Sequence, residues 1–277
     1  MKLRSFIIVA SILGFFVLNS SADAGYLDPD QGWKNITTYD GLSGSYGSQT
    51  NTWWNTNEDQ EVEPGAAIGQ QWDLEGFFLS DGTGNAAADS LAMVGGFDFA
   101  YGEGDIGSGD IFIDTDMSND YYEYVLDLKF RFTGNGKNKS TYTVYENTIK
   151  KPITLNLTHG GPAGETQDKP WTRKRGGKVV KSNGVRLRNI ALNYLSNQTN
   201  DQMGGGVTGG AHNAVIVDVS FLGSNVDYKV YNTLECGNDR LTGSSSAAVP
   251  EPATIFLLGS GLLGLFGYRK KLWKPKN

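Results

Sequence analysis

The chain has 277 residues, which allows one or two domains at roughly 150 residues each. Hydrophobic residues make up 39%, which excludes global disorder, and the 37 glycines follow no Gly-x-y period, which excludes collagen and favours turn-rich β structure. The formal net charge of −6 argues against nucleic acid as the main partner, and a single Cys excludes a disulfide framework.

The N-terminus is typical of a secretory signal peptide over residues 1–24. Two cations precede an apolar run, residues 6–18, whose length lies within the roughly 7–15 residues expected of such a run. Ala22 and Ala24 form a small-x-small cleavage site, so Gly25 is predicted to begin the mature chain. An uncleaved anchor helix is the alternative, but the run is shorter than the about 20 residues that span a bilayer.

The next two regions differ in their patterning. Residues 25–64 are rich in Gly, Ser, Thr, Asn and Asp and are predicted to form a loosely structured arm. Residues 65–242 alternate apolar and polar side chains with period two, most clearly over 122–130 and 214–221, which predicts half-buried antiparallel strands. Further strands are expected over residues 71–79, 91–99, 110–113, 141–144, 153–157, 178–181, 185–195 and 227–234.

The turns between these segments are glycine-rich, and no helical periodicity occurs between the two ends of the chain. The fold class predicted is therefore all-β. The body is expected to be an antiparallel β-sandwich or jelly roll, flanked by an N-terminal signal helix and a C-terminal transmembrane helix.

Four side chains with oxygen ligands alternate after the predicted strand 110–113: Asp114, Asp116, Ser118 and Asp120. Calcium ions need several such ligands at close spacing, so a Ca²⁺ site is one interpretation and a solvated acidic turn is the other. The segment departs from an EF-hand loop, because Asn119 stands at the glycine position and Val125 at the position of the bidentate glutamate.

A basic segment interrupts the acidic body and contains an aromatic residue: Trp171, Arg173, Lys174 and Arg175. Clustered cations beside an aromatic ring fit an anionic polysaccharide, whereas the alternative is an exposed hairpin with solvated charges. The other Trp and Tyr residues fit either a sugar-stacking platform or the core of a sandwich.

Signatures of catalysis are few. The chain has no Gly-x-Ser-x-Gly turn, P-loop or His-Glu-x-x-His motif. His159 and His212 both lie beside glycine-rich turns and are interpreted as polar loop residues, so no catalytic residue is predicted. Cys236 is expected to be a small buried residue, with an intermolecular disulfide as the alternative.

The C-terminal region is divided into a Gly/Ser/Ala linker, residues 243–249, and a terminal segment, residues 250–277. Pro250, Glu251 and Pro252 cannot continue a helix or a central strand, so they predict an extended, solvated peptide. Residues 253–268 are uncharged and contain four glycines, and they run into three cations: Arg269, Lys270 and Lys271. This order predicts a short stop-transfer helix whose basic end stays in the cytoplasm.

Together, the Pro-Glu-Pro peptide, the short glycine-rich apolar helix and the basic cluster resemble the PEP-CTERM sorting signal of Gram-negative bacteria. The resemblance implies recognition by an exosortase, a membrane-embedded processing enzyme. It also implies that Pro250, Glu251 and Pro252 are recognition residues of a substrate. The precursor would be anchored transiently in the inner membrane, and its body would then reach the cell surface or the medium.

Of the 24 basic and 30 acidic residues, seven and two lie in the terminal segments, so residues 25–250 carry a formal charge of −11. We expect an exported, non-enzymatic protein of the cell surface or extracellular matrix, associated with biofilm or exopolysaccharide. Its expected partners are an exosortase-like enzyme and an extracellular polysaccharide but no nucleic acid, and Ca²⁺ is the sole candidate cofactor. The alternatives are a secreted carbohydrate-binding module, with or without Ca²⁺, and a secreted hydrolase.

Overall fold

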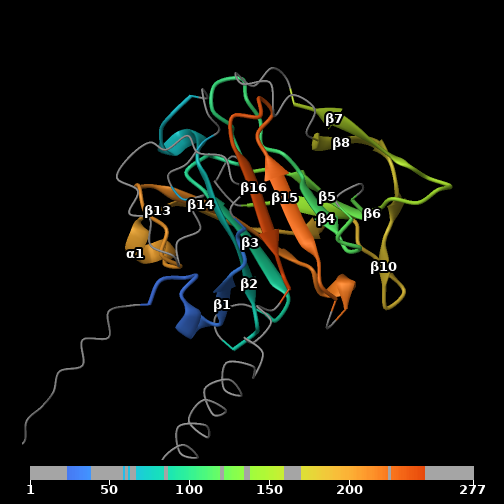
Figure 1. Cartoon of the computed structure of the whole chain (residues 1–277), viewed down its shortest axis with the longest axis horizontal. Helices are drawn as coiled ribbons and strands as arrows, with labels where there is room; N and C mark the ends of the chain where they lie inside the picture. The colour runs from blue at the N-terminus through green and yellow to red at the C-terminus, as the bar shows by residue number, and fades with distance from the viewer. Residues whose placement is uncertain are drawn as a thin grey trace, which may run out of the picture.

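The computed structural model describes residues 24–38, 59, 62, 67–83, 87–118, 122–133, 138–158, 170–223 and 226–246. In these ranges the chain forms sixteen strands, all of whose pairings are antiparallel (Figure 1). The helices within them are short: η1 (Pro29–Gln31), η2 (Gln70–Trp72), α1 (Asn200–Met203) and η3 (Ser220–Leu222). The prediction of an all-β, antiparallel body is confirmed, and both predicted terminal helices lie outside the described residues.

Two main sheets contain most of the strands. The first, which we call sheet A, has the order β1 (Trp33–Asn35), β2 (Leu74–Ser80), β3 (Ser90–Gly95), β14 (His212–Asp218), β13 (Asn193–Gln198). The second, sheet B, has the order β12 (Ile190–Ala191), β6 (Thr141–Glu146), β5 (Tyr124–Lys129), β4 (Ile111–Asp114), β15 (Lys229–Thr233), β16 (Arg240–Ser244), and β6 also pairs with β9 (Lys178–Val179).

Two hairpins stand outside these sheets: β7 (Ile153–Leu157) with β8 (Pro170–Gly176), and β10 (Lys181–Ser182) with β11 (Val185–Arg186). In sheet B the order β15-β4-β5-β6 is that of a Greek key. In sheet A, by contrast, β1, β2 and β3 are neighbours in chain order, and β14 joins β3 rather than β1. The fold is therefore a two-layered sandwich rather than the pair of Greek keys of a jelly roll.

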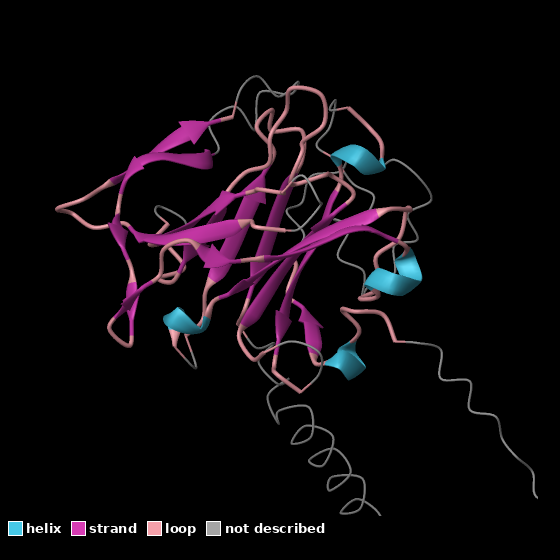
Figure 2. Ribbon diagram, turned by 180° about the vertical axis from the view of Figure 1, so that it is seen from behind, coloured by secondary structure: helices cyan, strands magenta, loops and turns pink. Residues whose placement is uncertain are grey.

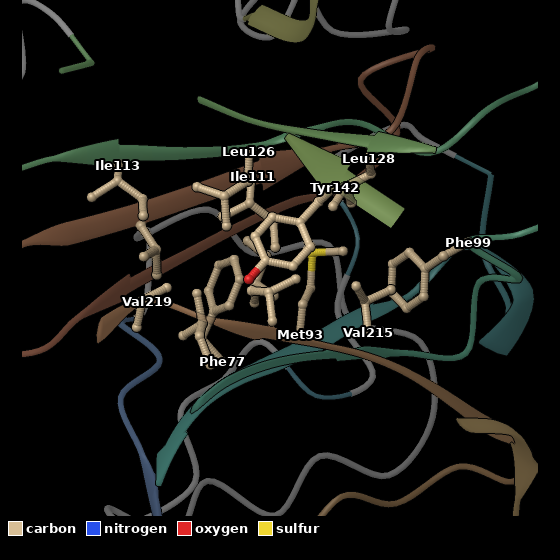
Figure 3. Packing of buried hydrophobic residues seen from close by; sticks show 14 of the residues in the cluster. Phe77, Met93, Phe99, Ile111, Ile113, Leu126, Leu128, Tyr142, Val215 and Val219 are labelled. Carbon is tan, nitrogen blue, oxygen red and sulfur yellow. The ribbon is translucent and has the colours of Figure 1, made fainter. Parts of the chain in front are cut away.

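The main core lies between the two sheets (Figure 3). Sheet A contributes side chains such as Phe77, Met93 and Val215, and sheet B contributes Leu126 and Tyr142. The alternation predicted over 122–130 is confirmed, because its apolar side chains face this core. The strand is not half-buried as predicted, since Val125 and Asp127 on its other face are buried too. Since burying one large apolar side chain contributes about 1.5–3 kcal/mol, this layer supplies most of the driving force for folding.

Sheet A is buried on its second face as well, and there the prediction of a half-buried strand over 214–221 is wrong. Ala214 and Ile216 point away from the main core into a second cluster that includes Leu27, Trp33 and Met203. The N-terminal segment and α1 cover this face. Alternation along one strand does not show what covers its other face.

The segment predicted as a loose arm contributes a strand to the sandwich. Residues 33–35 pair with β2, and the next residues cross to sheet B, where Thr37 forms a bridge with Gly243. The amide of Ile36 donates to Phe77 of β2 (2.9 Å), and the carbonyl of Ile36 accepts from Ser244 of β16 (2.7 Å). This segment therefore joins the two sheets along one edge, and β16 extends past the linker boundary predicted at 243.

Other predicted strands are shortened or divided. The strand expected over 185–195 is divided into β11, β12 and the beginning of β13. Asn189 has a φ of +52°, which is incompatible with a continuous strand. The strand expected over 214–221 ends at Asp218, where η3 begins two residues later.

Candidate functional site

The hairpin of β7 and β8 lies over part of the outer face of sheet B and stands apart from the two main sheets (Figure 2). Ile153 and Leu155 of β7 pack on a small apolar cluster formed by Phe112, Val125 and Tyr231. Strand β8 was not predicted, because its polar run over residues 172–175 hides any alternation. The basic segment of the sequence is thus a strand that packs on sheet B through one of its faces.

Arg173 anchors this hairpin. Its Nε and Nη2 donate to Oδ2 of Asp127 on β5 at 3.1 and 2.6 Å, and its Nη1 donates to the carbonyl of Gly176 at 3.1 Å. The guanidinium carbon lies 3.5 Å from the centre of the Tyr145 ring, a cation–π contact. With its side chain only 14% exposed, Arg173 is engaged inside the protein and separated from the exposed cations of the predicted patch.

Asp110, just before β4, is hydrogen-bonded to three strands: its carboxylate contacts β5 and β8, and its backbone carbonyl accepts from Asn232 of β15 at 3.0 Å. Its Oδ1 accepts from the amide of Leu128 at 3.0 Å, and its Oδ2 accepts from the amide of Arg173 at 2.6 Å. Burial, and secondly the charge of Asp127, raise the pKa of Asp110 to about 7. A Cβ at the preceding residue, Gly109, would lie 2.2 Å from the carbonyl oxygen of Thr233 in β15 and 2.7 Å from that of Trp171 in β8, so the chain passes this close to both strands only with glycine there.

A cleft of about 380 Å³ opens beside the hairpin. Thr172 and Arg173 of β8 line one side of it, and the loop that contains Tyr101 lines another. Tyr101 is 72% exposed and stacks on Phe132, with ring centres 5.3 Å apart. Lys129 also reaches the cleft, but its ammonium group pairs with Asp127 at 2.7 Å.

The remaining residues of the predicted patch differ in exposure. Trp171 is half-buried, whereas Lys174 and Arg175 are exposed. Exposed cations continue along the chain through β9, β10 and β11: Lys178, Lys181, Arg186 and Arg188. The exposed cations therefore extend from β8 to residue 188 and are not confined to the four residues of the predicted patch.

The predicted calcium segment is only partly assembled. Asp114 and Asp116 meet Glu123, which was not predicted, with ligand oxygens within 4.8 Å of one another. Ser118 donates its amide to Oδ1 of Asp116 at 2.9 Å, and Asp120 lies outside the described residues. Asp114 Oδ1 already accepts from the amide of Met117 at 2.7 Å, so this carboxylate caps the turn after β4. Glu123 was not predicted as a ligand because it lies beyond the alternating residues 114–120, directly before β5, which pairs with β4.

A second group of carboxylates surrounds the buried His212 of β14. Its Nδ1 lies 2.7 and 2.8 Å from the two carboxylate oxygens of Glu75, and its Nε2 lies 2.7 Å from Oδ1 of Asn200 in α1. Burial raises the pKa of Glu75 well above its usual value, with the charge of Asp59 adding to the effect, and burial lowers the pKa of His212. Oxygens of Asp59, Asp73 and Glu75 lie within 4.8 Å of one another. The predicted loop histidine is thus a buried group that links α1 to sheet A, whereas His159 lies outside the described residues.

Cys236 forms no disulfide and is half-buried, and its side chain packs against the main core. It follows β15 in the turn that leads to β16. This position agrees with a small, partly apolar side chain at the edge of the core.

Gly25, the predicted first residue of the mature chain, packs closely against Asp28 and Gly204. The amide of Gly25 donates to Oδ2 of Asp28 at 2.7 Å, and Oδ1 of Asp28 accepts from the amide of Gly205 at 2.7 Å. A Cβ at residue 25 would lie 2.3 Å from Cα of Gly204, so no side chain fits there. Ala24 is exposed, and Ala22 lies outside the described residues.

The residues of the predicted sorting signal also lie outside the described residues: Pro250, Glu251, Pro252, Arg269, Lys270 and Lys271. Within the part of the chain that the structure describes, no helix combines the length and the apolar character needed to cross a bilayer. Comparison with protein families matches residues 248–271 to the PEP-CTERM protein-sorting motif. No curated protein and no solved structure matches the chain.

Proposed function

Because the chain carries a PEP-CTERM protein-sorting motif, which belongs to exported proteins sorted by an exosortase, we propose that it is a non-enzymatic component of the cell surface or extracellular matrix, associated with biofilm or exopolysaccharide. The observation that carries this proposal is the motif at residues 248–271. It begins within a few residues of Ser245, whose amide still bonds to the sandwich (2.9 Å). The sorted cargo is therefore the β-sandwich itself.

The pathway has three physical steps. The signal peptide, residues 1–24, directs the chain across the inner membrane. The apolar residues 253–268 then hold the precursor there, with Arg269, Lys270 and Lys271 retained in the cytoplasm. Cleavage near Pro250 finally releases or transfers the acidic body.

The close packing of Gly25 supports cleavage after Ala24. An N-terminal ammonium group at Gly25 would lie beside the carboxylate of Asp28, whose oxygen is 2.7 Å from this nitrogen. The absence of space for a side chain at residue 25 also agrees with a chain that begins there with glycine.

A non-enzymatic role is supported by how the titratable groups of the described residues are used. Both oxygens of Asp110 accept backbone hydrogen bonds, and Asp127 is held by Arg173 and Lys129. His212 and Glu75 are closed off from solvent. These groups stabilise the fold where a hydrolase would need carboxylates that are open to substrate.

Replacing Pro250, Glu251 and Pro252 with alanine tests the sorting step. We expect the variant to accumulate as unprocessed precursor in the inner membrane, measured by immunoblotting of cell fractions and mass spectrometry of both chain ends. A matched control replaces Lys274, Pro275 and Lys276, a tripeptide outside the matched motif, and should be processed normally. Normal release of the first variant would refute the proposed sorting.

A further inference from the structure

Exposed cations recur along residues 174–188, on β8, on β9, on the hairpin β10–β11 and just after it. We call this surface the basic face and define it by six residues: Lys174, Arg175, Lys178, Lys181, Arg186 and Arg188. Strands β7, β8 and β10 stand to one side of the two main sheets, so the two hairpins, which carry four of these cations, project from the sandwich (Figure 1). No Asp or Glu occurs between Pro170 and Asn200, in a body that carries a formal charge of −11.

Among the described residues, one of these six charges is neutralised by an ion pair. Lys178 pairs with Glu146 at 2.9 Å, in a contact where both side chains reach solvent. Among the described residues, the other five cations of the basic face make no ion pair. Arg173 shows the contrast, since the same strand turns one cation inward onto Asp127 and leaves its neighbours facing solvent.

One pairing in the basic face is unfavourable for stability. Lys181 and Arg186 are directly opposite each other in the antiparallel pair β10–β11. Like charges in this position repel and destabilise a hairpin. A local arrangement that costs stability without a structural gain is typical of a functional surface, where a ligand of opposite charge relieves the repulsion.

We propose that the basic face binds a linear polysaccharide that carries carboxylate or sulfate groups. An extended row of cations matches repeated negative charges along a polymer, and each contact releases bound counterions. The inference rests on the proposed function and deepens it, because it names the binding surface and the chemical class of the polysaccharide. It retains Lys174 and Arg175 of the patch predicted from sequence, but assigns Arg173 to the fold.

Two other polyanions fit the surface less well. Binding to an anionic bilayer requires a broad apolar face beside the cations. Among residues 174–188, which contain the basic face, Val185 is the one exposed large apolar side chain. Single-stranded nucleic acid is bound by stacking on aromatic rings, and residues 172–190 contain no Phe, Tyr or Trp.

The test uses the full chain, purified in nonionic detergent, on immobilised polygalacturonate, heparin and uncharged dextran. The basic-face variant carries Lys174→Gln, Lys181→Gln and Arg186→Gln. The control variant carries Lys34→Gln, Arg131→Gln and Lys139→Gln, which removes the same three charges from exposed sites elsewhere. We expect the basic-face variant to lose at least about tenfold in affinity for the polyanions and the control less than about twofold.

Three further readouts accompany the affinities. Binding should weaken steeply between about 50 mM and about 200 mM salt, and dextran should not be retained. The melting temperature of the basic-face variant should be unchanged or higher, because the Lys181–Arg186 repulsion is removed. Vesicles containing phosphatidylserine and a DNA duplex should bind more weakly than the polysaccharides.

The proposal would be overturned by equal losses in the two variants, by retention of neither polyanion, or by tighter binding to vesicles or DNA. A lower melting temperature in the basic-face variant would assign the cations to the fold and would overturn it as well. None of these results depends on processing at the Pro-Glu-Pro peptide, so failure here is distinguishable from failure of the proposed sorting.

Discussion

Cleavage after Ala24 would turn the backbone N–H of Gly25 into an ammonium group beside the carboxylate of Asp28. The nitrogen of Gly25 is 2.7 Å from Oδ2 of Asp28, and the other carboxylate oxygen already accepts from Gly205 at 2.7 Å. Since the mature end then gains an ion pair that the precursor lacks, Asp28→Asn should destabilise the mature chain more than a chain that keeps the residues before Gly25.

The magnitude follows from the contacts. A hydrogen bond to a charged group contributes about 1.5–3 kcal/mol. Asp28 accepts two such bonds in the precursor as well as in the mature chain, and an asparagine can keep one of them through its remaining oxygen. The added attraction of a partly exposed ion pair is up to about 1 kcal/mol. We therefore expect Asp28→Asn to cost about 2–3 kcal/mol in the mature chain and about 1 kcal/mol less in the extended chain.

The assay is urea unfolding of four proteins, which begin at Gly25 or at Ala22 and carry Asp28 or Asp28→Asn. The difference between the two substitution costs isolates the coupling of the ammonium group to the carboxylate. Because the coupling requires a charged ammonium group, whose ordinary pKa is about 8, it should be lost as the pH rises well above that value. Equal costs at the two chain lengths, or a coupling that persists at high pH, would refute the ion pair between the Gly25 ammonium group and Asp28.

Three other predictions concern the fold that supports the basic face. Since the pKa of Asp110 is raised to about 7 and its unfolded value is 3.8, the folded state keeps a proton that the unfolded chain releases as the pH rises between these values. Stability attributable to Asp110 should thus fall by up to about 4 kcal/mol from pH 4 to pH 7, and Asp110→Asn, measured by urea unfolding at each pH, should remove this decline; an unchanged slope would contradict the burial argument. Arg173→Met leaves the buried Asp127 with Lys129 alone and should lower the free energy of unfolding by about 3 kcal/mol. The exposed control Arg175→Met should lower it by less than about 0.5 kcal/mol. Similar losses for the two variants in chemical denaturation would argue against Arg173 as the anchor of the hairpin. Phe77→Ala opens a cavity in the main core and should cost about 3–5 kcal/mol, and a smaller loss would mean that the sheets close over the gap.

The sequence alone determined the features that depend on neighbouring residues along the chain. Alternation over 122–130 predicted β5 and its core face, because successive side chains of a strand point to opposite sides whatever surrounds it. The sorting motif was recognisable for the same reason, since its three parts follow one another directly in the sequence. The antiparallel, all-β class followed from many such strands joined by glycine-rich turns.

Only the tertiary structure decided what each of these elements meets. Arg173 and Lys174 are adjacent cations in the same basic run, yet one is bound to Asp127, 46 residues away, and the other faces solvent. Glu123 joins Asp114 because β5 returns beside β4, and Ile216 is buried because the N-terminal segment lies across sheet A. Partners far apart in the chain come together only when the sheets pack against each other, and the spacing of residues along the sequence does not predict these contacts.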